Sequence, residues 1–288
     1  MQQPFRTEHL EAVLERSIRR CHSLSRSWGL EVIKVELVGG APVLVKAGTP
    51  TLPGHLESEA FMLRELAVQS ELPVPGVLHC EPTLLVMEWI DNDGAPRTPA
   101  HEHHAAELLA RLHSHKSARF GYGRNTVIGG LLQPNGEQES WVAFFAHKRL
   151  LYMARLALSA GALEAGELSR IEALAGRLAR YLDEPAHACL LHGDLWQGNI
   201  LAKGDKIVGL IDPAIYFGHR EIELAFTTLF GTFGDRFFDA YSAFYELDQD
   251  FFALRKDIYN LYPNLVHATL FGRSYVPAVL RVLDRLGV

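Results

Sequence analysis

The sequence predicts an α+β protein of two lobes, a small β-rich lobe over residues 1–90 and a larger, mainly helical lobe over residues 91–288. Strand-like apolar runs dominate before residue 90, whereas apolar residues recur at helical spacing over most of the chain after it. Residues 91–96 (DNDGAP) combine residue types that favour turns, so we expect the boundary between the lobes there.

In the first lobe, apolar spacing predicts a helix over residues 7–19, with Thr7 as its cap. Strand and turn signals are found at residues 31–38, 39–42, 43–46 and 83–90. A second helix is expected over residues 56–69, and it places Glu59 on the same face as Leu63. A carboxylate that faces the core is costly unless it meets a cation, so Glu59 is expected to pair with one.

In the second lobe, helical runs are expected at residues 101–116, 141–158, 163–182 and from 221 to the C-terminus. Short β segments interrupt them at residues 189–192, 200–201 and 206–212. We expect these segments to form a β-hairpin that faces the cleft between the lobes.

Composition excludes several classes of protein. The net charge of −6 argues against a nucleic-acid binder, which would carry a basic excess. The three cysteines are too few and too scattered for a disulfide framework or a zinc site. Because neither a signal peptide nor a membrane span is recognisable, the expected location is cytoplasmic, with no membrane partner.

Residues 192–199 (HGDLWQGN) carry the strongest chemical signal. Asp194 and Asn199 are five residues apart, and the intervening glycines allow tight turns. This spacing lets Asp194 face an acceptor group while Asn199 turns its side-chain oxygen toward a metal ion. Asp212 ends an apolar strand, which holds a carboxylate rigidly, and carboxylate and amide oxygens suit Mg²⁺.

Phosphoryl transfer from ATP requires metal ions, a cation on the phosphates and a carboxylate near the acceptor hydroxyl. The chain supplies these groups in the expected order, namely Lys46 on a strand, Glu59 on the next helix, Asp194 with Asn199 on a loop, and Asp212 after a strand. The sequence therefore indicates a phosphotransferase that uses ATP and Mg²⁺.

Residues 192–199 resemble the catalytic loop of the fructosamine kinase (ketosamine 3-kinase) family, within the aminoglycoside phosphotransferase and protein-kinase-like superfamily. The Leu-Trp pair inside this loop is typical of the fructosamine branch. Other similar segments are residues 120–121, Asn125, 129–133, 212–221 (DPAIYFGHRE), 229–231 and 267–275. The resemblance covers most of the chain from about Leu44 onward and implies a bilobal protein-kinase-like fold.

The resemblance also implies roles for individual residues. Asp194 would be the catalytic base, and Asn199 and Asp212 would hold Mg²⁺. Lys46, paired with Glu59, would hold the α- and β-phosphates of ATP. The hinge that borders the adenine would consist of Met87, Glu88, Trp89 and Ile90. Trp196 would pack against the substrate.

One segment departs from the family pattern. The family carries a glycine-rich turn of the Gly-Gly-x-Ile-Asn type between its first two strands, whereas residues 23–29 (SLSRSWG) hold a single glycine. Backbone amides and the hydroxyls of Ser25 and Ser27 are the groups left to cover the phosphates. The departure concerns nucleotide affinity more than the reaction itself.

The family resemblance implies phosphorylation of the 3-hydroxyl of the sugar in ketosamines, such as fructosamine or ribulosamine adducts on amines or proteins. The implied role is repair of glycated molecules, with small ketosamines or glycated proteins as partners. The alternatives are a kinase for another small acceptor, such as an aminoglycoside, choline or an amino alcohol, and a nucleotide-binding pseudokinase.

For several further residues we prefer a structural role over a functional one. The histidines of the third expected helix fit a surface helix better than a metal site; they are His101, His103, His104, His113 and His115. His192 is expected to brace its loop. Residues 219–221 (HRE) favour a structural turn over a substrate site. Core packing is the simplest role for Phe226, Phe230, Phe233, Phe237 and Phe238.

Overall fold

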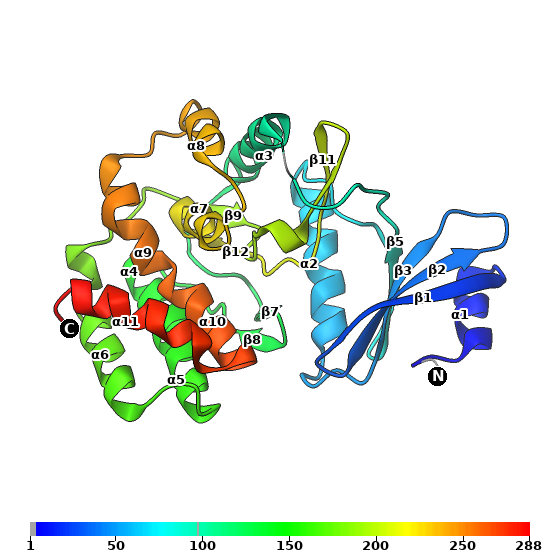
Figure 1. Cartoon of the computed structure of the whole chain (residues 1–288), viewed down its shortest axis with the longest axis horizontal. Coiled ribbons are helices and arrows are strands. Elements are labelled where there is room, and N and C mark those ends of the chain that lie inside the picture. Colours follow the sequence, from blue (N-terminus) through cyan, green and yellow to red (C-terminus); the bar gives the residue numbers. More distant parts are fainter. Residues whose placement is uncertain (1–3, 97) are drawn as a thin grey trace.

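The computed structural model describes residues 4–96 and 98–288. Two lobes lie side by side along the long axis of the molecule, with the N- and C-termini at opposite ends (Figure 1). The smaller lobe is built on a β-sheet and the larger one is mainly helical, which confirms the predicted α+β architecture.

The N-terminal lobe is an antiparallel sheet with the strand order β1–β2–β3–β5–β4, flanked by helices. Its elements are α1 (Thr7–Leu14), β1 (Ile18–Ser27), β2 (Leu30–Leu37), β3 (Val43–Gly48), α2 (His55–Gln69), β4 (Val77–Glu81) and β5 (Leu84–Glu88). Leu10 of α1 packs on one face of the sheet against residues such as Val35 and Val45. The opposite face packs against α2 and turns toward the cleft.

The prediction of a helix over residues 7–19 is wrong at its end and at its cap. The helix stops at Leu14 because Glu15 adopts the left-handed conformation, with φ of 52°. Ile18 then pairs with Leu37 across the sheet, so strand pairing overrides the helical spacing of the apolar residues. Thr7 is the first helical residue rather than the cap. Strand β4 was missed, since its sequence VLHCE alternates too weakly to predict an edge strand.

Helix α2 is packed against both lobes, as its position between them in Figure 1 illustrates. Leu56, Ala60 and Leu63 join the cluster beneath the sheet. Met62 and Leu66 belong instead to the main core of the C-terminal lobe. Because both sides of α2 are buried, the side chain of Glu59 has a fixed position relative to both lobes.

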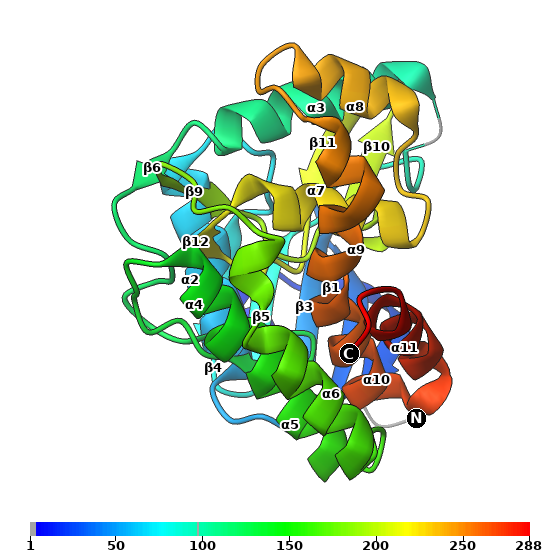
Figure 2. The same ribbon diagram turned by 90° about the vertical axis from the view of Figure 1, so that its left-hand side faces the viewer.

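The C-terminal lobe packs its helices around one large apolar core. Its helices are α3 (Pro99–Leu112), α4 (Trp141–Phe144), α5 (Leu151–Ser159), α6 (Ala165–Ala175), α7 (Arg220–Leu229), α8 (Asp235–Ser242), α9 (Lys256–Tyr259), α10 (Leu261–Phe271) and α11 (Val276–Arg285). A π-helical segment, Phe145–Leu150, joins α4 to α5 within the predicted helix over residues 141–158. Helices α3 and α8 lie side by side in both Figure 1 and Figure 2.

The C-terminal lobe also contains short strands. They are β6 (Lys116–Ser117), β7 (Thr126–Ile128), β8 (Leu131–Gln133), β9 (Ala188–Leu191), β10 (Ile200–Lys203), β11 (Lys206–Leu210) and β12 (Tyr216–Gly218). Strands β10 and β11 form the expected hairpin. The segment that connects the lobes is held against this hairpin, since the Asp93 amide donates to the Ala202 carbonyl at 2.8 Å.

The predicted boundary between the lobes after residue 90 stays a prediction. It lies between the last strand of the sheet and the first helix of the larger lobe. The sheet of the N-terminal lobe ends at Glu88, and the first helix of the C-terminal lobe begins at Pro99. In the part of the chain that the structure describes, no helix has the length and apolar character needed to cross a membrane.

Candidate active site

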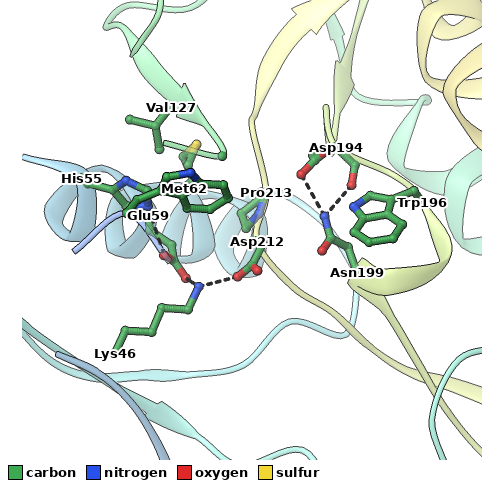
Figure 3. A pocket seen from close by; sticks show the side chains of 12 residues that line it. Lys46, His55, Glu59, Met62, Val127, Asp194, Trp196, Asn199, Asp212 and Pro213 are labelled. Atoms are coloured by element: carbon green, nitrogen blue, oxygen red, sulfur yellow. Dashed lines mark hydrogen bonds and ion pairs between the residues drawn. The ribbon is translucent and has the colours of Figure 1, made fainter. Parts of the chain in front are cut away.

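A cleft between the lobes brings together most of the predicted site residues. Its walls include Lys46, Glu59, Asp194, Trp196, Asn199 and Asp212, together with residues to which no site role was predicted, among them Trp28, His55, Met62 and Gly129. The predicted residues come from the sheet, from α2 and from two loops of the C-terminal lobe (Figure 3).

Lys46 holds the centre of the cleft. Its ammonium donates to Glu59 Oε1 at 2.7 Å and to Asp212 Oδ1 at 2.5 Å, so the cation expected for Glu59 is present. Burial raises the pKa of Glu59 to about 7, although Lys46 opposes the shift. Burial also opposes ionisation of Asp212, but the ammonium outweighs it and holds the pKa of Asp212 below its usual range. The lysine therefore stabilises charge mainly on Asp212.

Asp194 lies on a loop that two backbone features fix. Gly193 has φ of +84°, and a Cβ there would lie 2.0 Å from the Ala214 carbonyl oxygen, so only glycine fits. The Gly193 amide donates to Glu223 Oε1 at 2.6 Å. Gly198 is needed because the indole of Trp196 lies over its backbone and leaves no room for a side chain, rather than because of a tight turn.

The side chain of Asn199 is hydrogen-bonded to Asp194 within this loop. Its amide nitrogen donates to the backbone oxygen of Asp194 at 2.8 Å and to Asp194 Oδ2 at 2.9 Å. The amide oxygen is consequently left to face away from Asp194 (Figure 3). Burial, with the nearby Asp212 carboxylate, raises the pKa of Asp194 to about 7 despite the Asn199 hydrogen bond.

Asp212 is held in an unusual backbone conformation, with φ of +52°. Non-glycine residues in this region carry strain and cluster at functional sites. The segment that follows is fixed from below, because buried Gln133 donates to the Ala214 carbonyl at 2.9 Å. About half of the Asp212 side chain remains exposed to the cleft, so it stays open to a ligand.

Trp196, which lines the cleft, belongs to a cluster of aromatic rings. Trp196 contacts Phe230 with ring centroids 5.6 Å apart, and Phe230 contacts His267 at 5.1 Å. His267 in turn contacts Phe271 and Tyr275. We call Trp196, Phe230, His267, Phe271 and Tyr275 the aromatic shelf. Phe230 is only half-buried, whereas Phe226, Phe233, Phe237 and Phe238 are buried as predicted.

The predicted hinge residues lie apart from the cleft centre. Met87 is buried in β5 opposite Leu44, a neighbour of Lys46 on the same face of β3. Ile90 approaches Gly209 of β11, and Trp89 lies under the ammonium of Lys34 at 4.1 Å. The Glu88 carboxylate accepts from the Gly76 amide. The adenine-binding role of these residues stays a prediction.

Most of the segment over residues 23–29, which stands where the family has its glycine-rich turn, is strand. Ser23, Ser25 and Ser27 belong to β1 and pair with β2, so only Trp28 and Gly29 form the turn. Ser25 and Ser27 are exposed.

A buried hydrogen-bonded chain behind the catalytic loop was missed by sequence reasoning. His113 Nε2 lies 2.9 Å from Glu223 Oε2, and its Nδ1 lies 2.7 Å from the Tyr241 hydroxyl. Burial opposes ionisation of Glu223, but its hydrogen bond with His113 keeps its pKa below the usual range. Because Glu223 also accepts from the Gly193 amide, the chain reaches the residue before Asp194.

The assignment of the α3 histidines to a surface face is wrong for two of them. His113 is buried in this chain, and His101 is buried with Nε2 2.7 Å from the Gly204 carbonyl. His192 is also buried. The 219–221 turn is structural, since His219 accepts from the Glu221 amide and the Glu221 carboxylate binds Arg255 at 2.6 Å.

An antiparallel sheet with a buried lysine, facing a His-Gly-Asp loop and a strand-ending aspartate across a cleft, defines a kinase with the protein-kinase-like fold. The model of the family described as fructosamine kinase matches residues 5–287. The chain belongs to the fructosamine kinase family.

Curated and solved proteins agree with this assignment. A probable ketoamine kinase from Enterococcus faecium is 32% identical over 80% of this chain and 82% of its own length. The chloroplastic protein-ribulosamine 3-kinase of Arabidopsis thaliana is 29% identical over 91% of this chain and 85% of its own. A crystal structure assigned as a fructosamine-3-kinase from Thermobifida fusca has a TM-score of 0.87 at 31% identity, with 98% of each chain covered. An aminoglycoside phosphotransferase, at 16% identity and a TM-score of 0.66, shares the fold.

Removing Lys46 is predicted to destabilise the protein more than removing its partner Glu59. Lys46→Met leaves a buried carboxylate without its cation and is expected to lower the free energy of unfolding by about 3–5 kcal/mol. Glu59→Gln leaves Lys46 bound to Asp212 and is expected to cost about 1 kcal/mol. Urea unfolding measures both.

The Lys46→Met loss is expected to be smaller at about pH 5 than at about pH 8. Burial raises the pKa of Glu59 above its value in the unfolded chain, so at low pH the folded variant can hold Glu59 in the protonated, uncharged form. This protonation stabilises the folded variant, and the stabilisation is lost as the pH rises. Lys34→Met, which removes a cation from the neighbouring strand without breaking an ion pair to Glu59, is the control. Equal losses for the two active-site variants would contradict the assigned pairing.

His113→Ala is predicted to impair catalysis from a distance. Glu223 would lose a buried partner, so we expect a stability loss of about 3–5 kcal/mol and a lower kcat as the Gly193 amide shifts, with ATP affinity retained. Tyr241→Phe is the milder version, and His103→Ala, an exposed change on the same helix, is the control. Wild-type kcat in a folded His113→Ala protein would contradict the positioning role.

Proposed function

We propose that this protein transfers the γ-phosphoryl group of ATP to the 3-hydroxyl of the sugar in a ketosamine, a step that prepares the adduct for removal. The observation that carries the proposal is the position of Asp194, which shares one cleft with Lys46 and Asp212 on one side and with Trp196 on the other. Membership of the fructosamine kinase family and the 3-kinase name of the Arabidopsis relative support the choice of acceptor.

On the nucleotide side, Lys46 binds the α- and β-phosphates, and Glu59 holds the ammonium in place from α2. The residues present fit a Mg²⁺ ion, since Asn199 presents an amide oxygen and Asp212 a half-exposed carboxylate of lowered pKa. Mg²⁺ neutralises charge on the phosphates when bound. Met87, Glu88, Trp89 and Ile90 border the adenine, with the backbone of Glu88 and Ile90 at its edge.

On the acceptor side, Asp194 accepts the proton of the sugar hydroxyl. A pKa of about 7 suits a general base at neutral pH, and the two hydrogen bonds from Asn199 orient the carboxylate. The indole of Trp196, which is half-buried at the edge of the same cleft, offers a flat face to the sugar.

An acceptor panel tests the proposal. ATP consumption with Mg²⁺ is measured against fructosamine and ribulosamine adducts of lysine, free and in a glycated protein, and against choline and an aminoglycoside. We expect turnover on at least one ketosamine and on neither of the others. Turnover confined to choline or the aminoglycoside contradicts the proposed acceptor, and ATP binding without any turnover identifies a pseudokinase.

Asp194→Asn is predicted to lower kcat by roughly a hundredfold to ten-thousandfold, because the acceptor hydroxyl loses its base. Binding of ATP and the thermal unfolding temperature are expected to stay close to wild type, as the substitution keeps the shape of the side chain. Asp205→Asn, in the exposed turn between β10 and β11, is the matched control. A substantially active Asp194→Asn protein would refute the assigned role.

A further inference from the structure

The turn between β1 and β2 presents a tryptophan where the family carries glycines. Trp28 adopts the left-handed conformation, with φ of 49°, and Gly29 follows with φ of 80°. A Cβ at Gly29 would lie 2.1 Å from the Thr49 carbonyl oxygen, and the Trp28 carbonyl accepts from the Thr51 amide at 2.9 Å. The turn is therefore anchored to the segment after β3, which gives the indole a defined direction.

The indole of Trp28 crosses from the N-terminal lobe to the C-terminal lobe. A Cβ added to Gly130 would lie 2.8 Å from Trp28 Cγ, so the indole lies directly on the backbone of the turn between β7 and β8. The ring also contacts Phe271 of the aromatic shelf, with centroids 6.4 Å apart. Trp28 thus adds an aromatic contact between the two lobes, next to the aromatic shelf.

Trp28 and Trp196 line the same cleft as Asp194, but they come from opposite lobes. Trp196 is part of the loop that carries Asp194, and its ring packs against Phe230. Trp28 is attached to the sheet that carries Lys46, through the pairing of β1 with β2 and of β2 with β3. The cleft that holds Asp194 therefore has an aromatic side chain from each lobe in its lining.

We propose that Trp28 is a positioning and specificity-determining residue for the acceptor, forming the second aromatic wall opposite Trp196 and closing the cleft against water. The inference rests on the proposed phosphorylation of a sugar hydroxyl. An acceptor can contact Trp28 and Trp196 at once only when the two lobes are packed as they are here. The same packing brings Lys46 to the cleft, so binding of the acceptor favours the arrangement that positions Lys46 for phosphoryl transfer. Closure that excludes water favours transfer to the acceptor over hydrolysis of ATP.

The first experiment compares wild type with Trp28→Ala and Trp28→Phe on a ketosamine that wild type phosphorylates. The loss of one aromatic contact is expected to raise the acceptor KM about tenfold in Trp28→Ala, while the KM for ATP changes much less. ATP hydrolysis without acceptor is expected to rise relative to phosphoryl transfer. Trp28→Phe restores most of both properties, which a purely structural role would not predict.

A matched change on the facing lobe tests the same contact. Gly130 does not have a positive φ, so Gly130→Ala is tolerated by the backbone but displaces the indole. We expect Gly130→Ala to raise the acceptor KM in the wild-type background and to add little to Trp28→Ala, a non-additive double-mutant cycle. Leu24→Ala, an exposed change in the same strand β1, is the control and is expected to leave the constants unchanged.

The outcomes separate this inference from the proposed function. A wild-type protein that phosphorylates no ketosamine refutes the proposed function on which the inference rests. Wild-type turnover with an unchanged acceptor KM and unchanged hydrolysis in a folded Trp28→Ala protein refutes the inference alone. An increase in kcat/KM for the acceptor also overturns it, because the indole would then block the site. Thermal unfolding of each variant establishes that it is folded.

Discussion

The shared cation at Lys46 is the constraint on which the rest of the site depends. A buried ammonium must be paired, and here its partners come from α2 and from the segment after β11. The same contacts that neutralise the charge therefore fix α2 against the sheet and tie the sheet to the C-terminal lobe. The apolar packing of α2 into both lobes supports this geometry, since Leu63 joins one core and Leu66 the other.

The catalytic loop is held by a second set of buried groups that leaves its reactive side free. Glu223 receives the Gly193 amide from behind, and Asn199 fixes Asp194 from the side. Asp194 and Asp212 then differ through their surroundings alone. Burial raises the pKa of Asp194, whereas Lys46 lowers that of Asp212, which suits one for a proton and the other for a cation.

The site could be predicted from the sequence to the extent that chemistry fixes residue types and their order. Lys46, Glu59, Asp194, Asn199 and Asp212 were found because phosphoryl transfer needs those groups, and the spacing within HGDLWQGN is local. The end of α1 could not be found in this way, since the apolar spacing of residues 7–19 continues past the point where Ile18 pairs with Leu37. The burial of His113 was equally hidden, because its partners are more than a hundred residues away along the chain.

The sequence by itself therefore determined the family, the two-lobed architecture and the charged groups of the site, all of which depend on local patterns or on residue types in a fixed order. Only the tertiary structure decided which of these groups form hydrogen bonds and which share a cation. It also decided that Trp28, on a segment that lacks the family's glycines, lies on Gly130 of the opposite lobe. The physical reason is that contact between segments far apart in the sequence depends on how the lobes pack. Neither hydrophobic periodicity nor motif spacing encodes how close two such segments lie in the folded protein.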